Sequence, residues 1–562
     1  MPYLLPTLFF LFFSIAVMAS QEVERWGVFE ILLSGPPDSP SFNAFDVVAN
    51  ATFSHATAEA LTVAAFYDGQ SRYLVRFSPP ELGVWAWVTA SDSPMMPQSH
   101  GFVTATVPSL NNHGPVIVDA NASTFFRFAD GSEHFSVGTT MYAWAHVNSS
   151  NAQTTLATLR GGPFNKLRMT LFPKFYPWTH SPPASPNFFA FMRASPPLPP
   201  PSPSKCFQSM NGTFDLTRFN PVFWQTIESY VRELMEEGIQ VDIILFHPYD
   251  SGQYGFDCMP PTADAAYLRY AAARLGGFRN IWWSMANEWS DLKCKCAGKN
   301  SSECPETYFD ALFEILTPAD PHRRQRSIHN GPIYYNASRP WIDHISMQCH
   351  NASCVDFAHA SWTPKPIVMD EIRYLGNITA SWGQLTPEQM VQRFWMYFSK
   401  GVYAGHSETL LSEALTTICA NPNDCDCDAI MWWNRGGVLS DFISPSAIAW
   451  FRNYVDTLPV PFNSLVSETL VPGVYWLHDA AATTYNLVLW DEDALSVVTS
   501  ATIPLPNNTR FTLRHIDFMA QRLIPVNSTS DGGPLIFTPP TPGFLLELVI
   551  LSPSTSTAQI NI

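Results

Sequence analysis

Residues 115–460 repeat a single pattern, in which a short apolar segment is followed by an amphipathic helical one. Apolar runs of this kind are typical of buried parallel strands, which need helical crossovers between them. The repeat predicts eight strands in a (β/α)8 barrel. A doubly wound sheet is the alternative, although no glycine-rich loop follows the first strand, as a nucleotide-binding sheet requires. The candidate strands are Phe135–Thr140, Asn165–Leu171, Val241–Phe246, Asn280–Ala286, Ser327–His329, His344–Met347, Ile367–Asp370 and Val402–Gly405.

The clearest predicted helix runs from Pro221 to Gly238. Asn220 is a capping residue, Pro221 has the backbone angle of a first helical turn, and Gly238 ends the pattern. The proline-rich segment Ser195–Ser204 can form neither a helix nor a central strand. We interpret it as a loop insertion, either on the functional face of the barrel or simply tolerated there. The other predicted helices span residues 264–275, 303–316, 387–400 and 445–457.

Short strand-like segments separated by turn residues flank the barrel on both sides. This spacing is typical of β-sandwich domains, and Asp68-Gly69 is a hairpin turn signal within the first of them. The predicted fold class is therefore α/β, a (β/α)8 TIM barrel between two β-sandwich domains. The expected division is a signal peptide at 1–19, an N-terminal domain at 20–110, the barrel at 115–460 and a C-terminal domain at 462–562.

The first residues predict export from the cell. An apolar run ends in Val17 and Ala19, which suit the −3 and −1 positions of a signal-peptidase site. An uncleaved membrane anchor is the alternative. We expect a secreted, extracellular glycoprotein with no stable membrane association after cleavage. Asn-x-Ser/Thr sequons agree with that expectation and begin at Asn50, Asn121, Asn148, Asn211, Asn300, Asn336, Asn351, Asn377, Asn507 and Asn527.

Eight of the 10 cysteines lie in local clusters within polar segments, as disulfides of a secreted protein do, and Cys206 and Cys258 remain. Zinc is the alternative, but the one-residue spacings at Cys294-x-Cys296 and Cys425-x-Cys427 are shorter than structural zinc sites prefer. We expect Cys349–Cys354 and Cys206–Cys258 to be bonded. One further bridge should join the cluster at 294, 296 and 304 to the cluster at 419, 425 and 427.

The net charge of −17 leaves no basic stripe that could neutralise phosphates, so nucleic acid is an unsuitable partner. Aromatic residues make up 14 % of the chain, whereas charged residues make up only 14 %, below the roughly 25 % usual for globular proteins. Aromatic faces stack on sugars, so the aromatic residues that follow predicted strands suit a carbohydrate substrate. No cofactor or metal is predicted.

Two of the predicted strands end in a glutamate. The run from Ile281 ends in Asn287-Glu288, and the run from Pro366 ends in Glu371. In a (β/α)8 barrel, the residues that follow the strands face the active site. Two such carboxyl groups are what a glycosidase needs, one as proton donor and one as nucleophile, and a retaining enzyme holds them about 5–5.5 Å apart.

Other strand ends supply side chains suited to binding a sugar. Buried Arg168 needs a carboxylate partner, since an unpaired guanidinium is costly to bury. His247 and Asp250 are either substrate-binding or hydrogen-bonded loop residues. Gln348, His406, Glu408 and Trp433 also follow predicted strands. The predicted substrate-binding set is Tyr142, Trp144, Arg168, His247, Asp250, Asn287, His350 and Trp432.

Several stretches of the N-terminal region and the barrel together resemble a family of glycoside hydrolases. Its members have an N-terminal β domain, an apiosidase-like barrel and a C-terminal β domain. The Asn287-Glu288 and Glu371 positions are also similar to the clan of retaining (β/α)8 glycoside hydrolases, which implies that Glu288 is the acid/base and Glu371 the nucleophile. The stretches are VERWGVFE, FYDGQSRYLVRFSPPELGVW, FNKLRMTLFPK, DIILFHPYD, RNIWWSMANEWS, KPIVMDEIRYLGNI, GVYAGHSET and WWNRGGVLSD.

We therefore expect a secreted retaining glycoside hydrolase that cleaves a poly- or oligosaccharide by double displacement through two glutamates. A non-catalytic carbohydrate-binding or adhesion protein on a barrel scaffold is the main alternative, and the presence of both glutamates counts against it. A metal-dependent hydrolase using His247, Asp250 and His350 is a third possibility, but no His-x-x-x-His pairing supports it.

Overall fold

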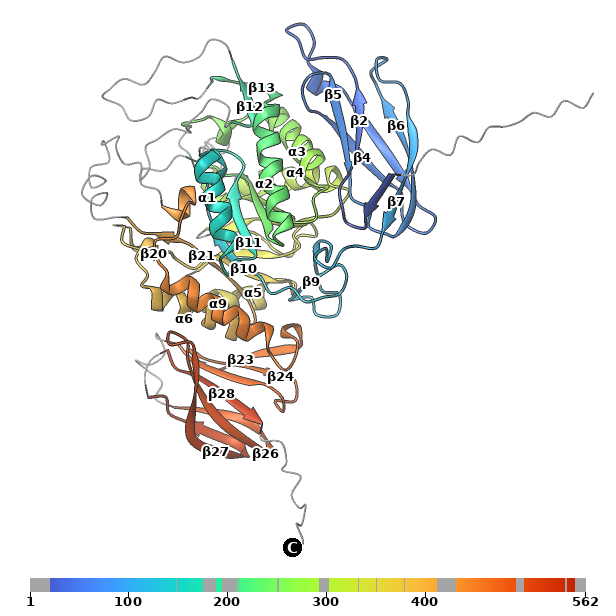
Figure 1. Cartoon of the computed structure of the whole chain (residues 1–562). Coiled ribbons are helices and arrows are strands. Elements are labelled where there is room, and N and C mark those ends of the chain that lie inside the picture. Colours follow the sequence, from blue (N-terminus) through green and yellow to red (C-terminus); the bar gives the residue numbers. More distant parts are fainter. Residues whose placement is uncertain are drawn as a thin grey trace, which may run out of the picture.

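The computed structural model describes residues 21–147, 149–174, 189–194, 210, 212–249, 252–292, 303–331, 333–349, 351–378, 380–411, 431–491, 500–540 and 543–550. Its centre is a parallel sheet of nine strands (Figure 1). All eight predicted strands are present, but the fifth is split into two short pieces. In chain order the strands are β10 (Val137–Thr140), β11 (Lys166–Thr170), β14 (Gln240–Phe246), β15 (Ile281–Ala286), β16 (Gln325–Ser327), β17 (His329–Asn330), β18 (Ile345–Gln348), β19 (Ile367–Glu371) and β21 (Tyr403–His406).

The strand order shows that the sheet closes into a barrel. It runs β16-β15-β14-β11-β10-β21-β19-β18-β17, and every neighbouring pair is parallel. The two ends of this order, β16 and β17, are the two pieces of the fifth strand, separated only by Ile328. The alternative of an open, doubly wound sheet is therefore excluded, and the carboxyl ends of all strands meet on one side.

Helices cover the outside of the barrel (Figure 1). Helix α2 follows Asn220, has Pro221 in its first turn, and ends before Gly238, whose φ of 71° is readily adopted by glycine. Thr386 and Gln389 form a capping box at the start of α6. The helices are α1 (Ser149–Arg160), α2 (Pro221–Glu236), α3 (Pro261–Leu275), α4 (Glu303–Ala319), α5 (Ser353–Ser361), α6 (Pro387–Ser399), α8 (Trp432–Arg435) and α9 (Ile443–Asp456).

A small hairpin closes the end of the barrel at which the strands begin. It consists of β8 (Val116–Val118) and β9 (Phe126–Phe128). The ring of Phe126 lies 4.9 Å from that of Trp282 and 5.1 Å from that of Tyr403, between centroids. The amide of Phe126 also donates to the Tyr403 hydroxyl at 3.0 Å. The opposite end of the barrel, where the strands finish, is therefore where a substrate would bind.

The N-terminal region is β-rich and has a core of its own. Its strands form one connected sheet in the order β1-β7-β6-β3-β4-β5-β2. This sheet folds over, because Phe29 of β2 lies 6.3 Å from Phe53 of β3 although two strands separate them in the order. The strands are β1 (Gln21–Glu24), β2 (Phe29–Ser34), β3 (Ala49–Ser54), β4 (Leu61–Tyr67), β5 (Arg72–Phe77), β6 (Gly83–Ser91) and β7 (His100–Thr106).

The C-terminal region is an antiparallel sheet in the order β23-β24-β25-β28-β26-β27. In β25, Leu487 and Leu489 belong to the barrel's hydrophobic core, whereas Val488 and Trp490 belong to a second core beneath the curled β26–β27 hairpin. The face of the sheet that carries Leu487 and Leu489 therefore packs on the barrel, below α6 and α9 in Figure 1. The strands are β23 (Leu465–Val471), β24 (Val474–Asp479), β25 (Asn486–Trp490), β26 (Ala501–Asp517), β27 (Arg522–Phe537) and β28 (Leu545–Ile550).

A buried cluster of charges joins the N-terminal sheet to the barrel. Arg76 of β5 and Arg274 of α3 both donate to Oε1 of Glu228 in α2, at 2.9 and 2.6 Å. Arg274 also donates to Asp68, in the turn after β4, at 2.8 Å. Burial opposes ionisation of Glu228, but the two guanidinium groups outweigh it and lower the pKa of this carboxyl group.

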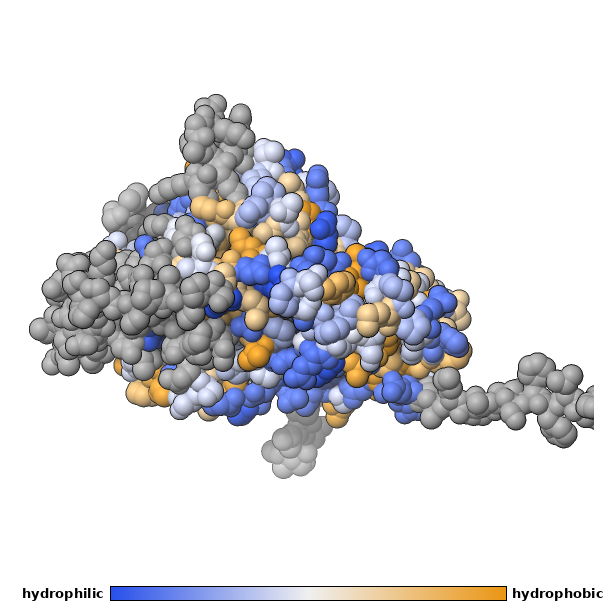
Figure 2. All heavy atoms as spheres, turned by 90° about the horizontal axis from the view of Figure 1, so that it is seen from above, coloured by the Kyte–Doolittle hydropathy of each residue, from blue (hydrophilic) through white to orange (hydrophobic). Residues whose placement is uncertain are grey.

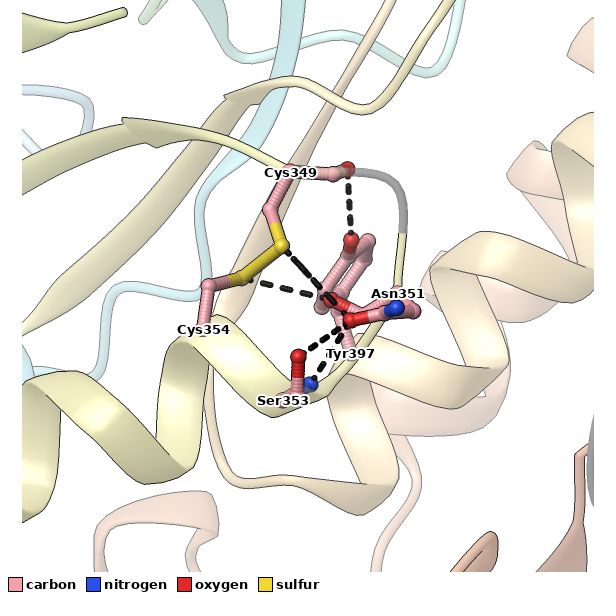
Figure 3. The surroundings of a disulfide bond; sticks show 5 residues. All are labelled: Cys349, Asn351, Ser353, Cys354 and Tyr397. Atoms are coloured by element: carbon pink, nitrogen blue, oxygen red, sulfur yellow. Dashed lines mark hydrogen bonds between the residues drawn. A yellow bond between two sulfur atoms is a disulfide. The ribbon is translucent and has the colours of Figure 1, made fainter. Parts of the chain in front are cut away.

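The structure describes both cysteines of one predicted disulfide and one cysteine of another. Cys349 and Cys354 form the predicted disulfide just after β18 (Figure 3). Tyr397 of α6 donates to the carbonyl of Cys349 at 3.0 Å, so this loop is also anchored to the helix layer. Cys258 is disulfide-bonded as well. Its predicted partner Cys206, the signal peptide, the segment 195–204 and the other predicted bridge lie outside the described residues.

Apolar residues on the surface are distributed in small groups. In the face shown in Figure 2 they are separated by hydrophilic residues and do not form one continuous patch. Among the helices that are described, none is both long enough and apolar enough to cross a membrane.

The buried position of Glu228 predicts that it contributes strongly to stability. Glu228→Gln should remove the buried carboxylate that Arg76 and Arg274 share, leaving Glu30 and Asp68 as their counter-charges, and lower the free energy of unfolding by roughly 3 kcal/mol. Because the pKa of Glu228 is lowered in the folded state, its contribution should be present near pH 7 and disappear as the pH falls through that pKa. Thermal unfolding at pH 7 and pH 3 would measure both effects.

The matched control is Glu59→Gln, which removes the exposed ion pair with Arg323 between the same two regions. Exposed pairs contribute little, so the unfolding temperature should hardly change. Equal losses for the two variants would contradict the proposed importance of the buried cluster.

Candidate active site

Two carboxyl groups lie at the carboxyl end of the barrel. Glu288 lies two residues after the end of β15, and Glu371 is the last residue of β19. Asn287 sits between Ala286 and Glu288, and its amide is 1 % exposed. The charge of Glu371 acts on Glu288, so the two groups share one electrostatic environment. Parallel strands that close into a barrel thus bring together residues that are far apart in the sequence.

The backbone at Glu288 has a conformation that is rare for a residue with a side chain. Its φ is 43° and its ψ is 54°, in the left-handed region. Such strain is tolerated where the surroundings hold it, often at functional sites. A Cβ atom at Gly331 would lie 3.6 Å from both Cβ and Cγ of Glu288, in ordinary van der Waals contact, so the segment after the fifth strand lies beside Glu288. Gln348 of β18 donates to Oε1 of Glu288 at 2.9 Å.

Two donors and an imidazole ring from three strands surround Glu371. Arg168 of β11 donates to its Oε1 at 2.7 Å, and the Tyr142 hydroxyl after β10 donates to the same oxygen. Nε2 of His329 lies 3.3 Å away. Arg168 also donates to Oδ1 of Asn287. The register between β18 and β19 shifts here, because Met347 pairs with Met369 but Gln348 pairs with Glu371, and such bulges re-aim side chains.

The environment separates the pKa values of the two glutamates. Burial, followed by the charge of Glu371, raises the pKa of Glu288 above its usual value. Burial acts in the same direction on Glu371, but His329, Arg168 and the Tyr142 hydrogen bond outweigh it and lower the pKa of Glu371 to about 2. A pair whose environments drive the two pKa values apart is suited to acid and nucleophile roles.

His329 contributes to this separation only at low pH. Burial and the neighbouring Arg168 lower the pKa of its imidazole to about 3. The ring is therefore neutral near pH 7, and we attribute the ionised state of Glu371 under those conditions mainly to Arg168 and Tyr142.

Further charges fill the barrel below the site. Lys166 of β11 lies 2.6 Å from both Asp242 of β14 and Asp370 of β19. Ser346 of β18 donates to Asp370 at 2.5 Å and lies 2.9 Å from Nδ1 of His329. Burial opposes ionisation of Asp370, but Lys166 and Arg168 hold its pKa below its usual range. A layer of paired charges thus connects the barrel interior to Glu371.

Aromatic side chains form one wall of the site. Tyr374, in the loop after β19, lies 3.2 Å from the Tyr142 hydroxyl, between oxygen atoms. The ring of Trp433 in α8 lies 5.8 Å from that of Tyr142 and 5.3 Å from that of Trp382, between centroids. Trp382 is partly exposed, so its ring is available as a stacking surface.

Two predicted binding residues are buried in the core instead. Trp144 is fully buried against Tyr230 of α2, and its Nε1 donates to Met169. Trp432 is 1 % exposed and donates to Thr139 inside the barrel at 2.8 Å. Both indoles face the protein interior, so neither can stack on a substrate. The neighbouring residue, Trp433, contacts Tyr142 in place of Trp432.

The remaining predicted residues have different outcomes. His247 is 3 % exposed and its Nε2 lies 3.3 Å from the carbonyl oxygen of Phe172. This position agrees with the interpretation of His247 as a hydrogen-bonded loop residue. Asp250 and His350 lie outside the described residues. Within the described part of the chain, no three His, Cys, Asp or Glu side chains are arranged to bind a metal ion.

Three residues near the glutamates were not predicted as site residues. Lys174 donates to the Tyr249 hydroxyl at 2.7 Å, and Asn287 donates to the same hydroxyl. His329 contacts Glu371 as described above. Tyr249 and His329 follow or lie within predicted strands, so the strand-end rule that indicated Glu288 could also have indicated them. Lys174 lies four residues past β11, beyond the reach of that rule.

Comparison with known proteins agrees with this architecture. Residues 120–407 match a family model described as the apiosidase-like catalytic domain. Residues 22–92 match a domain of unknown function, DUF5060. A search of curated proteins found no match.

Two solved structures are similar over most of the chain. A candidate glycoside hydrolase from Bacteroides vulgatus is 28% identical, with a TM-score of 0.78, and the match covers 95% of this chain and 100% of that one. A glycoside hydrolase family 5 protein from the same species is 13% identical, with a TM-score of 0.54, over 78% of this chain and 93% of that one. At this lower identity the second match shows the fold alone.

The environment of Glu371 predicts the effect of removing Arg168. Arg168→Met should raise the pKa of Glu371. The acid limb of the activity profile should therefore move to higher pH by at least about one unit. Arg168→Lys keeps the charge and should shift the acid limb less. The pH dependence of kcat/KM for the three proteins would measure this, and an unchanged acid limb in Arg168→Met would contradict the assignment.

Proposed function

This chain belongs to the family of apiosidase-like catalytic domains and is a glycoside hydrolase, and on that premise we propose that it is a secreted enzyme that cleaves a poly- or oligosaccharide with retention of anomeric configuration. The observation that carries the acid and nucleophile roles is the opposite environment of the two glutamates, while retention is what the similarity of the Asn287-Glu288 and Glu371 positions to the retaining clan implies. The pKa of Glu288 is raised and that of Glu371 is lowered, so one is suited to give a proton while the other is ionised.

In the first step, the Glu371 carboxylate attacks the anomeric carbon, and the bond from that carbon to the leaving oxygen breaks. Glu288 gives its proton to the leaving oxygen, so the aglycone leaves as an alcohol. Arg168, Tyr142 and His329 all contact Oε1 of Glu371, and we therefore assign the attack to Oε2. The product of this step is a glycosyl ester of Glu371.

In the second step, water attacks the anomeric carbon from the side that the aglycone has left. Glu288, now a carboxylate, takes a proton from that water, and the ester bond to Glu371 breaks. Two inversions give net retention. Arg168 and Tyr142 stabilise the departing carboxylate, because they donate hydrogen bonds to it when it is charged.

We propose that Asn287 binds a sugar hydroxyl beside the nucleophile. Its Oδ1 accepts from Arg168, which fixes the orientation of the amide. Its Nδ2 lies 3.5 Å from Oε2 of Glu288, a long contact that a substrate hydroxyl can replace. Trp382, which is partly exposed and packs against the buried ring of Trp433, is proposed as the stacking surface for the sugar.

A purely carbohydrate-binding role is the rival function. Binding alone gives no reason to drive the pKa values of two carboxyl groups in opposite directions, and buried charges are costly to keep. The rival predicts that replacing either glutamate leaves the whole function intact, whereas the enzyme loses turnover.

Secretion is proposed from the apolar N-terminal run and the disulfide bonds. The Cys349–Cys354 disulfide and the bonded Cys258 fit an oxidising compartment. If the chain is exported, cleavage after Ala19 should leave Ser20 at the N-terminus. Sequencing of the mature protein from a secreting host would test this, and an intact N-terminus on a membrane-bound product would favour the anchor instead.

The two-glutamate mechanism predicts distinct defects for the two glutamates. Glu371→Ala should lower kcat by roughly 10⁴-fold or more with little effect on KM, because the nucleophile acts in the chemical step. Azide should restore part of the activity and give a product of inverted configuration, since one displacement replaces two. Glu288→Ala should lose about 10²–10⁴-fold on ordinary glycosides but little on substrates with activated leaving groups.

The control is Glu408→Gln. Glu408 is another buried carboxyl group after a barrel strand, and burial raises its pKa to about 7. It accepts hydrogen bonds from the backbone N–H groups of Ser440 and Asp441, which makes it a loop anchor. Its replacement should leave the azide response and the leaving-group dependence unchanged. Wild-type turnover in both Glu371→Ala and Glu288→Ala would reject the mechanism.

A further inference from the structure

We propose that Tyr249, held by Lys174 and Asn287, is a positioning residue that stabilises the ionised form of Glu288 in the second half of the reaction. This inference rests on the function proposed above and adds a role for two residues, Tyr249 and Lys174, which lie in loops after neighbouring strands. Tyr249 follows β14 and Lys174 follows β11.

The hydrogen bonds around Tyr249 fix the direction of its own hydrogen. The ammonium group of Lys174 donates to the phenol oxygen at 2.7 Å, and the amide nitrogen of Asn287 donates to it as well. Neither group can accept a hydrogen bond in return. The phenol hydrogen is therefore directed at a third partner, and that partner is the carboxyl group of Glu288.

The cation makes Tyr249 a stronger donor. A hydroxyl that accepts from an ammonium group is polarised, and hydrogen bonds in such chains strengthen one another. Lys174 is fixed between two rings, with its Nζ 4.4 Å from the centroid of Tyr142 and 4.5 Å from that of Tyr249. Removing the Tyr249 hydroxyl would therefore break the link between Lys174 and Glu288 without removing the charge.

The groups that face Glu288 act in two directions. Burial and Glu371 of β19 favour its protonated form, whereas Lys174, Gln348 of β18 and Tyr249 favour its ionised form. Asn287 adds a weak donor at 3.5 Å. Among the described residues around Glu288, only Glu371 contributes a negative charge that the reaction itself removes.

The reaction changes this balance at the point where the role of Glu288 changes. While Glu371 is ionised, its charge holds the proton on Glu288 for the leaving oxygen. Once Glu371 has become an ester, that charge is gone, and the donors from Tyr249 and Gln348 favour a carboxylate that can take a proton from water. Tyr249 and Lys174 thus determine how good a base Glu288 becomes in the second step.

Tyr249→Phe tests this directly. For a substrate with an activated leaving group, the second step limits the rate, so kcat should fall about tenfold and KM should fall with it, while kcat/KM changes little. A burst of aglycone release should appear as the glycosyl ester accumulates. On an ordinary glycoside, whose first step needs the Glu288 proton, the alkaline limb of the kcat/KM profile should move up by about one pH unit, the size expected for one hydrogen bond to a charged group.

Lys174→Met should give a different signature. The charge of Lys174 lowers the pKa of both Glu288 and Glu371, so both limbs of the profile should move to higher pH. Tyr485→Phe is the matched control, because it removes a buried hydroxyl that lies 3.1 Å from that of Tyr454, in the C-terminal sheet. It should move neither limb. A loss of activity in Tyr249→Phe with an unmoved alkaline limb and no burst would overturn the inference.

A measurement on the free enzyme separates this inference from the proposed function. The pKa of Glu288 can be followed by carbon NMR of the labelled side chain, with Glu288→Gln identifying the signal. If Tyr249→Phe leaves this pKa unchanged while azide rescues Glu371→Ala, the role of Tyr249 fails and the mechanism stands. If azide does not rescue but the pKa rises, the mechanism fails and the contact between Tyr249 and Glu288 is supported.

Discussion

The pairing of Arg168 with Glu371 is the interaction on which the candidate site depends. A guanidinium group inside a barrel must be paired, because an isolated buried charge is too costly. Arg168 extends from β11 to Glu371 of β19 and to Asn287 just after β15, so one side chain ties together three strands that are not neighbours in the sheet. It fixes the position of Glu371 and keeps it ionised at the same time.

The layer below the site works in the same way. Lys166 balances Asp242 and Asp370, and Ser346 links Asp370 to His329. Apolar side chains would fill this volume at least as stably, since buried ion pairs seldom add net stability. What the charges supply is orientation, because each one restricts its partner to a narrow range of positions beneath Glu371.

The two β regions support the barrel from its outer surface. The N-terminal sheet contacts α2 and α3 through Glu228 and Arg274, and the C-terminal sheet packs near α6, where Lys400 donates to Thr469 at 2.9 Å. The β8–β9 hairpin closes the end at which the strands begin. None of these contacts involves Glu288 or Glu371, so the supporting contacts and the candidate site use different parts of the barrel.

The sequence by itself determined the kind of fold and the two central residues. Apolar runs alternating with amphipathic ones predict parallel strands and crossovers, and an acidic residue directly after such a run must lie at a strand end, as Glu288 and Glu371 do. The Cys349–Cys354 bridge was also predictable, because it is local in the chain. Only the tertiary structure decided which neighbouring side chains face the site. Trp432 turns into the barrel while Trp433 reaches Tyr142, and Lys174 reaches Tyr249 from a different loop, because these directions depend on how distant segments pack and not on their order along the chain.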